Sequence, residues 1–423
     1  MIVSAPDRGG KIRIIALVAI LLIGIFLRLP PTLFDTPTLR AVAWLHPQPK
    51  RIELGVDENL YRGYVDDLRR VGFAAYPDIV DNYIERQKTL SAAILPPVRF
   101  LYIFFAYTWQ TLFGNDALSA LRNVSALFSV FTLLFSVWLG RRLKGPGYVI
   151  SIAALMSFAP TQLHMSQYAL IDGFFGFWTL LMLWLLWENL RSPRVSWWWI
   201  VLYAFSLAAL VLTKENLFFV WLAILAILVA NRWLQIGSVT RELFYATLLG
   251  PLIGVVILAW LSGGVSTLIA TYQLFITKNY TFKYSILYQD GPWHRYLVDL
   301  LLVSPVILLL AIGSIFTLTY EKKVEWFFVI FIIASYAPMA GIRYGMNLRF
   351  ANMWDLPLRI LALSQLISLS GCLPKWRNAV VVAAIFMICV TEFRNYLVLA
   401  VDYPLYDLVS QNLFRALHIL KSP

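Results

Sequence analysis

Charged residues are scarce in this chain of 423 residues: Asp, Glu, Lys and Arg together make up 14%, whereas hydrophobic residues make up 60%. A sequence with this balance cannot cover the surface of an ordinary soluble domain with polar groups. No long hydrophilic tail, low-complexity tract or clear repeat interrupts the apolar segments. The composition therefore indicates a single integral-membrane domain that extends over residues 1–423.

Cysteine is also rare, and both cysteines, Cys372 and Cys389, lie in apolar stretches. This usage excludes a disulfide framework and gives no metal site. The formal net charge is +12, but Lys and Arg fall mainly in short segments between apolar runs. There they orient helices and meet anionic lipid headgroups, so the basic balance does not indicate a nucleic-acid partner.

A helix needs roughly 20 apolar residues to cross the hydrocarbon core of a membrane. The hydrophobic pattern predicts an all-α protein with about eleven or twelve transmembrane helices. The first has basic residues before it, as a signal peptide does, but Arg28, Pro30 and Pro31 stand where a cleavage site would need small residues. We expect a retained signal-anchor helix. The predicted spans are 12–29, 121–142, 147–163, 171–190, 197–213, 216–232, 243–262, 294–318, 325–340, 355–373 and 377–400.

The stretch 98–113 is short for a span and long for a loop. If it does not fully cross, every short basic loop lies on the side of the basic amino terminus, as the positive-inside rule requires. We therefore expect a re-entrant or partly inserted helix. The basic loops are 140–145, 188–194, 230–242, 320–325 and 373–378.

This orientation places two large loops, 30–97 and 263–293, on the outer face of the membrane. In the first loop, apolar residues spaced for one helical face predict an amphipathic helix over 57–71, and a second is expected around 78–90. We expect both helices to lie on the membrane surface.

The adjacent carboxylates Asp57 and Glu58 begin the first of these helices. An acidic pair outside the apolar spans suits proton abstraction or cation binding. The alternative is structural: Asp57 would cap the helix and Glu58 would interact with the helix dipole.

Four segments in order resemble the GT-C glycosyltransferases, and most closely the bacterial relatives of the protein O-mannosyltransferases and the lipid A aminoarabinose transferases. The resemblance covers nearly the whole chain and weakens after about residue 320. The segments are DENLY after the first helix, HMSQYALIDGFFGFWTLLMLWLLW (164–187), ALVLTKENLFF (209–219) and GPWHRYLVDLLLVSPVILLLAIG (291–313).

The resemblance implies an enzyme that moves a hexose or pentose from a polyprenyl-phosphate donor to a lipid, glycan or protein hydroxyl. It implies Asp57 as general base, with Glu58 orienting the acceptor, tuning Asp57 or helping to hold a divalent cation. The leaving lipid phosphate needs cations, for which Lys214 is the first candidate and Arg349 the second. Asp172 matches the aspartate of the family's ALxD junction and is implied as a third catalytic residue. The resemblance also implies that the active site lies on the extracytoplasmic face of a bacterial-type inner or plasma membrane.

Each assignment has a structural alternative. Asp172 could cap the following helix, and Lys214 could extend to the interface or pair with Glu215. His164 could be an interfacial histidine with a backbone partner; if the helix were continuous, it would share a face with Asp172. Arg343 and Arg349 could anchor the interface. Asp355 and Arg359 have the spacing of an ion pair within a helix.

No dense metal-binding set is evident, so no cofactor is certain and a metal requirement stays open. The donor sugar and the acceptor also stay open. The rival interpretation is a transporter or flippase of lipid-linked sugars without transferase activity. Transporters place polar groups near the membrane midplane and often contain internal repeats. Here the polar candidates gather at one predicted interface, which favours an enzyme.

Overall fold

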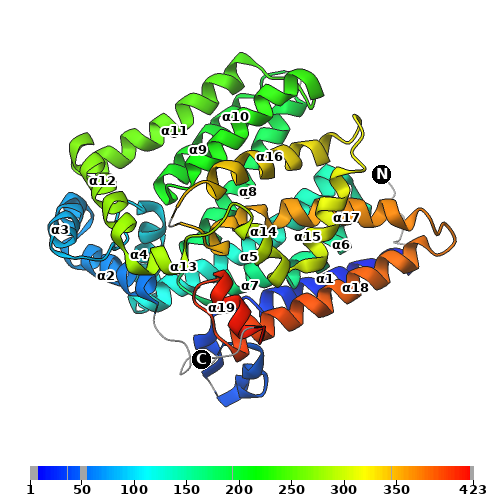
Figure 1. The fold of residues 1–423 in the computed structure, drawn as a ribbon, viewed down its shortest axis with the longest axis horizontal. Coiled ribbons are helices and arrows are strands. Elements are labelled where there is room, and N and C mark those ends of the chain that lie inside the picture. Colours follow the sequence, from blue (N-terminus) through cyan, green and yellow to red (C-terminus); the bar gives the residue numbers. More distant parts are fainter. Residues whose placement is uncertain (1–7, 36, 48–54, 193, 344, 420–423) are drawn as a thin grey trace.

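The computed structural model describes residues 8–35, 37–47, 55–192, 194–343 and 345–419. All regular elements in this part of the chain are helices (Figure 1), which confirms the predicted all-α class. The α-helices are α1 (Arg8–Phe26), α2 (Val56–Val71), α3 (Tyr76–Thr89), α4 (Phe100–Phe113), α5 (Ala117–Lys144), α6 (Val149–Ser157), α7 (Pro160–Gln167), α8 (Ile171–Arg191), α9 (Trp197–Thr213), α10 (Leu217–Leu234), α11 (Arg241–Leu261), α12 (Val265–Thr281), α13 (Lys283–Tyr288), α14 (Arg295–Val303), α15 (Pro305–Ile315), α16 (Lys323–Ala340), α17 (Asp355–Ser370), α18 (Arg377–Tyr396) and α19 (Ser410–Ala416).

Short helical turns connect these helices. Two 3-10 segments, η1 (Pro31–Asp35) and η2 (Pro37–Leu45), follow α1, and η4 (Phe73–Ala75) and η5 (Pro146–Tyr148) precede α3 and α6. The 3-10 turn η6 (Leu348–Trp354) leads into α17, and a π-helical turn, η7 (Leu397–Asp402), extends α18.

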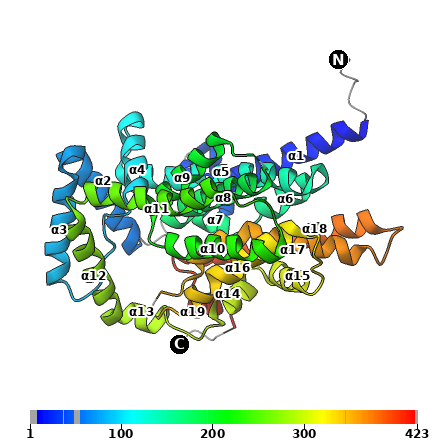
Figure 2. The same cartoon turned by 90° about the horizontal axis from the view of Figure 1, so that it is seen from above.

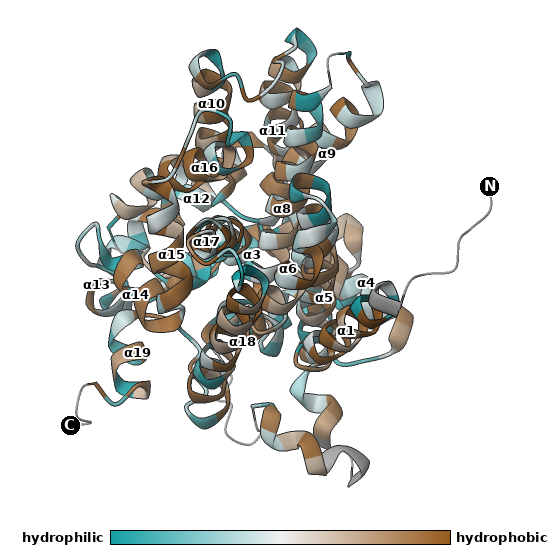
Figure 3. Ribbon diagram, turned by 90° about the vertical axis from the view of Figure 1, so that its right-hand side faces the viewer, coloured by the Kyte–Doolittle hydropathy of each residue, from teal (hydrophilic) through white to brown (hydrophobic). Residues whose placement is uncertain are grey.

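The protein is a polytopic membrane protein. Six helices of the described residues are long and apolar enough to cross a membrane, and three further apolar helices are shorter. Hydrophobic residues cover most of the long helices (Figure 3), and many are exposed, as lipid-facing side chains are. The six long helices are α5, α8, α10, α11, α16 and α18 with η7.

Two predicted spans are each divided into two helices. The predicted span 147–163 is broken before Pro160, and 294–318 is broken between Ser304 and Pro305. Proline lacks the N–H that would bond the preceding turn, and its ring clashes with that turn. Both prolines therefore begin a new helix, and the hydropathy of the sequence did not reveal these breaks.

The helix α4 contains 14 residues and ends at Gly114, which has a positive φ of 70°. At 1.5 Å per residue it is about 21 Å long, shorter than the roughly 30 Å hydrocarbon core. The expectation that 98–113 does not fully cross stays a prediction.

The amphipathic helices of the first loop form as predicted, as α2 and α3. The apolar face of α2 packs against α4 and α5. It is therefore covered by protein, whereas we expected this helix to lie on the membrane surface. The buried apolar residues are Leu60, Tyr61, Tyr64, Val65 and Leu68.

Four of the basic loops gather at one end of the helix bundle. Arg142 forms an ion pair with Glu188 (2.7 Å), Lys144 pairs with Glu325, and Lys323 donates to the carbonyl of Leu234. The loop between α17 and α18 extends from the right of Figure 1, whereas α2, α3 and α12 lie at the left, and the turned view in Figure 2 keeps this separation. The grouping of these loops matches the predicted topology.

Candidate active site

The candidate residues come from four elements that meet at the end of the bundle away from the basic loops. Asp57 lies in the first turn of α2, Asp172 in the first turn of α8, Lys214 directly after α9, and Arg349 in η6. The structure therefore brings together residues that are separated by up to 292 positions in the chain.

Arg349 is the centre of this cluster. Its Nη2 lies 3.0 Å from Asp57 Oδ2 and 3.1 Å from Asp407 Oδ1, and its Nε lies 3.8 Å from Asp172 Oδ2. The guanidinium also lies 5.0 Å from the ring centroid of Tyr406. One arginine thus organises three carboxylates.

Arg349 nevertheless keeps unused hydrogen-bonding capacity. Its side chain is 4% exposed, and neither Nε nor Nη1 has a hydrogen-bond partner among the described residues. The hydroxyls of Tyr168 and Tyr406 and Nδ1 of His164 are also buried without such a partner in the described part of the chain. Buried polar groups are normally satisfied, so such a group of donors and acceptors is typical of a site that takes a ligand.

Asp57 is the accessible carboxylate of the cluster, with 24% of its side chain exposed. Burial raises the pKa of the Asp57 carboxyl above its ordinary value; Arg349 opposes this effect and Asp407 adds to it. A carboxylate with a raised pKa is a better base than an ordinary one, and Asp57 retains access for an acceptor.

Glu58 points away from this cluster into the protein and has no exposed surface. Its Oε1 lies 3.1 Å from Arg122 Nε and accepts from the backbone N–H of Ala169 (2.8 Å). Its Oε2 accepts from the backbone N–H of Gly55 (3.2 Å), which caps α2. These contacts support a positioning role.

Lys214 is 2% exposed in its side chain and donates to Oδ1 of Asp172. Its ammonium lies 3.9 Å from the centroid of the Phe350 ring. Asp172 thus pairs with Lys214, α8 begins without a side-chain capping bond among the described residues, and Glu215 forms its ion pair with Arg99. Arg99 also donates to the hydroxyl of Tyr61 (2.7 Å). The roles of Asp172 and Lys214 stay predictions.

His164 and Asp172 do not share one helix, because α7 ends at Gln167 and α8 begins at Ile171. The ring of His164 bonds the carbonyl of Leu405 (2.6 Å), as the structural alternative expected. Arg343 is exposed, and Asp355 forms the predicted ion pair with Arg359 (2.9 Å).

Sequence reasoning missed Asp407, which follows the last predicted span. Its carboxylate accepts from the side-chain amide of Asn347 (2.7 Å) and from the hydroxyl of Tyr284, and it pairs with Arg349. The segment beside it closes over the start of α2, where a Cβ on Gly55 would lie 2.2 Å from the Tyr406 ring. A polar residue in the short segment YPLYDL was the available signal.

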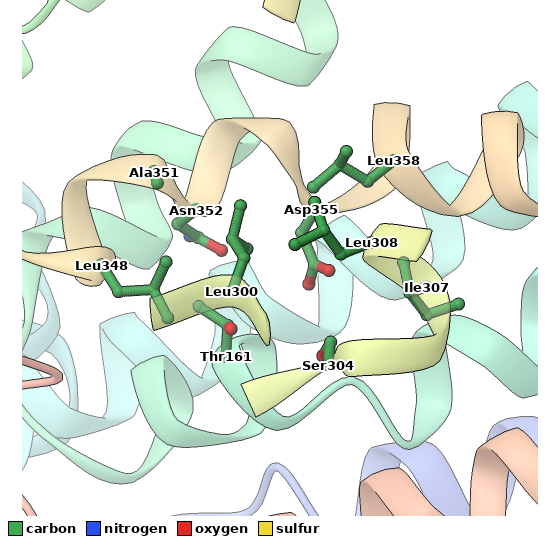
Figure 4. A pocket seen from close by; sticks show the side chains of 10 residues that line it. All are labelled: Thr161, Leu300, Ser304, Ile307, Leu308, Leu348, Ala351, Asn352, Asp355 and Leu358. Carbon is green, nitrogen blue, oxygen red and sulfur yellow. The ribbon is translucent and has the colours of Figure 1, made fainter. Parts of the chain in front are cut away.

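A small cavity of about 10 Å³ is lined by residues of α7, α14, α15, η6 and α17 and by Ser304 (Figure 4). Thr161, Ser304, Asn352 and Asp355 line it together with leucine side chains. This volume is close to that of one water molecule, so the cavity is too small for a sugar. No group of three or more His, Cys, Asp or Glu residues in the described ranges is arranged to hold a metal ion.

Residues 97–275 match the family model for dolichyl-phosphate-mannose-protein mannosyltransferases. The expected resemblance to GT-C glycosyltransferases is confirmed. The matched segment contains Asp172 and Lys214, and it ends before Arg349 and Asp407. No curated protein matches the chain in sequence.

Solved GT-C structures share the fold. ArnT from Cupriavidus metallidurans in the apo state superposes with a TM-score of 0.53 at 14% identity, covering 97% of this chain and 76% of ArnT. The Archaeoglobus fulgidus oligosaccharyltransferase in complex with Zn and sulfate gives a TM-score of 0.56 at 15% identity, covering 90% of this chain and 53% of that enzyme. The archaeal oligosaccharyltransferase AglB from Archaeoglobus fulgidus, in complex with an inhibitory peptide and a dolichol-phosphate, gives a TM-score of 0.52 at 12% identity, covering 91% of this chain and 55% of AglB.

Proposed function

We propose that this protein transfers a glycosyl unit from a polyprenyl-phosphate donor to a hydroxyl acceptor, with Asp57 as the general base. The observation that carries the proposal is the arrangement around Arg349. This residue holds the accessible carboxylate of Asp57 and keeps two N–H donors without hydrogen-bond partners among the described residues. Glycosyl transfer from a phosphate requires a base beside a cation that can still donate hydrogen bonds to the phosphate.

In the proposed reaction, Asp57 accepts the proton of the acceptor hydroxyl. At the same time, the hydroxyl oxygen of the acceptor bonds to the anomeric carbon of the donor sugar. The bond between that carbon and the phosphate oxygen breaks, and the lipid phosphate leaves with the electron pair. Negative charge on the leaving phosphate grows during this step. Arg349 and Lys214 would stabilise it by charge-assisted hydrogen bonds in a poorly hydrated place.

Asp172 and Asp407 hold these cations in position in the proposal. Asp172 bonds Lys214, and Asp407 bonds Arg349 opposite Asp57. Each cation would otherwise lose its orientation toward the phosphate, because long basic side chains have many rotamers. Glu58 fixes the first turn of α2, and through it the position of Asp57.

The relatives support a lipid-phosphate donor. The name of the matching family includes dolichyl-phosphate-mannose, and one structure of AglB contains a dolichol-phosphate. We propose that the acceptor reaches the site from the extracytoplasmic face. The proposal does not specify the donor sugar or make a divalent cation necessary.

The test is to incubate the purified protein with a panel of labelled polyprenyl-phosphate sugars and to measure the lipid phosphate released. Release is expected for at least one donor. The variant Asp57→Asn keeps the size of the side chain but removes its basicity, so turnover should fall by about 10²–10⁴-fold while the donor still binds. A transporter or flippase would release no lipid phosphate, and near-parental turnover of Asp57→Asn would remove Asp57 from the role of base.

A further inference from the structure

A second cavity, of about 230 Å³, lies between the connection from α13 to α14 and the last helix, α19. By the same measure, this volume is about 23 times that of the 10 Å³ cavity lined by Thr161 and Ser304 (230/10). Both polar and apolar side chains form its wall. They include Leu287, Tyr288, Asp290, Arg295, Gln411 and Phe414.

Arg295 is a buried cation in this wall, with 6% of its side chain exposed. Two of its nitrogens donate to the backbone carbonyls of Asp290 and Tyr288. Its Nε has no hydrogen-bond partner among the described residues, although it lies 3.8 Å from Oδ2 of Asp299. These contacts hold the guanidinium as a fixed polar part of the cavity wall.

Asp299 lies behind the wall with no exposed surface. Its Oδ1 accepts from the hydroxyl of Ser410 (2.6 Å), which lines the cavity, and its Oδ2 has no hydrogen-bond partner in the described part of the chain. Asp290 also lines the cavity, and it contacts Arg295 through its backbone carbonyl. Because Asp299 lies 3.8 Å from Arg295 and balances its charge, the cavity offers an anion no uncompensated cation, and a hydrocarbon chain would leave the polar groups unsatisfied.

We infer that this cavity binds a neutral sugar unit of the acceptor. A sugar offers hydroxyl groups that both donate and accept, which suits carboxylate, amide and guanidinium groups in one wall. Its apolar ring face suits Tyr288 and Phe414. This inference rests on the proposed function, because only a glycosyltransferase would need an acceptor there.

The cavity and the candidate active site share their framework. On α13, Tyr284 bonds Asp407 of the site, whereas Leu287 and Tyr288 line the cavity. Asp407 is followed after two residues by Ser410, which also lines it. This framework connects the wall of the cavity to Asp407 and, through Arg349, to Asp57. In the inference, one sugar of the acceptor occupies the cavity while the reacting hydroxyl of the same acceptor lies at Asp57.

The experiment measures both binding and turnover of the full-length protein in nanodiscs. The probes are the methyl glycosides of mannose, galactose and N-acetylglucosamine, and a peptide rich in Ser and Thr. Saturation-transfer NMR reports glycoside binding without requiring turnover. Release of lipid phosphate from the donor panel, with each probe as acceptor, reports transfer.

The decisive variant is Leu287→Trp, which places a larger side chain in the cavity. Ile286→Trp is the matched control, because Ile286 is a neighbour on α13 that does not line the cavity. At least one glycoside should bind the parent, and Leu287→Trp should weaken its binding and raise its KM by about tenfold or more, whereas Ile286→Trp should behave as the parent. Gln411→Ala, at an exposed position, should raise the KM in the same direction without affecting folding.

Two results would overturn the inference: no glycoside binds the parent, or binding is unaffected by Leu287→Trp and Gln411→Ala. A third result would also overturn the inference: the peptide accepts the sugar, none of the glycosides does, and neither Leu287→Trp nor Gln411→Ala changes the rate of transfer to the peptide. If a glycoside binds and Leu287→Trp weakens this binding, but no donor releases lipid phosphate, the sugar site is supported and the proposed transferase function is wrong. The two failures are therefore distinguishable.

Discussion

Asp57 and Glu58 are adjacent in the chain, but the two carboxylates bind different arginines on different elements. Arg349 of η6 holds Asp57 at 3.0 Å, and Arg122 of α5 holds Glu58 at 3.1 Å. The first carboxylate is partly accessible and the second is completely buried. The first turn of α2 therefore supplies both Asp57, the candidate base, and Glu58, the buried carboxylate that fixes this turn against α5.

This difference predicts that Glu58→Gln lowers stability more than it lowers the turnover of folded protein. The substitution keeps an oxygen that can accept from Ala169 but leaves the buried charge of Arg122 without its partner. Breaking a buried ion pair in this way costs about 3–5 kcal/mol. Thermal unfolding in detergent, followed for the parent and for Glu58→Gln, measures the effect.

The matched control is the double variant Glu58→Gln/Arg122→Met, which removes both charges. It should recover much of the lost stability, because no uncompensated charge is then buried. A Glu58→Gln protein that unfolds at the parental temperature but has no turnover would instead assign Glu58 to the chemistry.

The sequence allowed prediction of the fold class and the existence of α2 and α3, because hydrophobic length and period-3.6 spacing are local signals. The four residues Asp57, Asp172, Lys214 and Arg349 were also chosen from the sequence, through charge in apolar surroundings and the family resemblance. Asp407 and the pairing of each charge could not be predicted. Those features depend on which helix ends meet in three dimensions, and a single sequence does not encode that in any local pattern.

A second prediction concerns the pH dependence of turnover in Asp407→Asn. Burial and the negative charge of Asp407 both raise the pKa of Asp57, whereas Arg349 lowers it. Removing the charge of Asp407 favours the ionised form of Asp57, and it also leaves Asp57 as the only carboxylate within 3.1 Å of Arg349 among the described residues. The pKa of Asp57 should therefore fall, and the acid limb of the kcat/KM profile should move to lower pH.

The control for this shift is Tyr284→Phe, which removes the hydroxyl that donates to Asp407 but keeps the charge of the carboxylate. Its acid limb should stay close to that of the parent. An acid limb that moves to higher pH in Asp407→Asn would mean that Asp57 is not the titrating base.

A third prediction concerns the orientation in the membrane and uses single cysteines in intact cells. Reporters at Asn59 and Tyr288 should react with an impermeant thiol reagent from outside, and one at Gly147 should react only after the membrane is opened. Gly147 is exposed, and a Cβ there would meet no atom within 4 Å. Exposed Cys372 is replaced by Ser in the background protein.

External labelling at Gly147 would contradict the assigned orientation of the basic loops, because Gly147 directly follows the loop that contains Arg142 and Lys144. It would also mean that the polypeptide crosses the membrane once more, or once less, between Asn59 and Gly147. The segment 98–113, which forms α4, would then need to be reassigned as a full span.

The last prediction separates two roles of Lys214, which is bonded to Asp172 and nearly inaccessible to solvent. If Lys214 binds the donor phosphate, Lys214→Met loses a charge-assisted hydrogen bond worth about 1.5–3 kcal/mol, or roughly 10–150-fold in kcat/KM. Lys214→Arg should retain part of the activity.

The variant Lys214→Met cannot decide the question alone. It leaves the buried carboxylate of Asp172 with Arg349 as its remaining ion-pair partner among the described residues. The double variant Lys214→Met/Asp172→Asn removes both charges and is the decisive comparison. If Lys214 acts on the phosphate, the double variant stays as slow as Lys214→Met at every donor concentration. Recovery of parental turnover in a normally inserted double variant would show that Lys214 only neutralises Asp172, and Arg349 would then be the sole candidate among these residues for the phosphate.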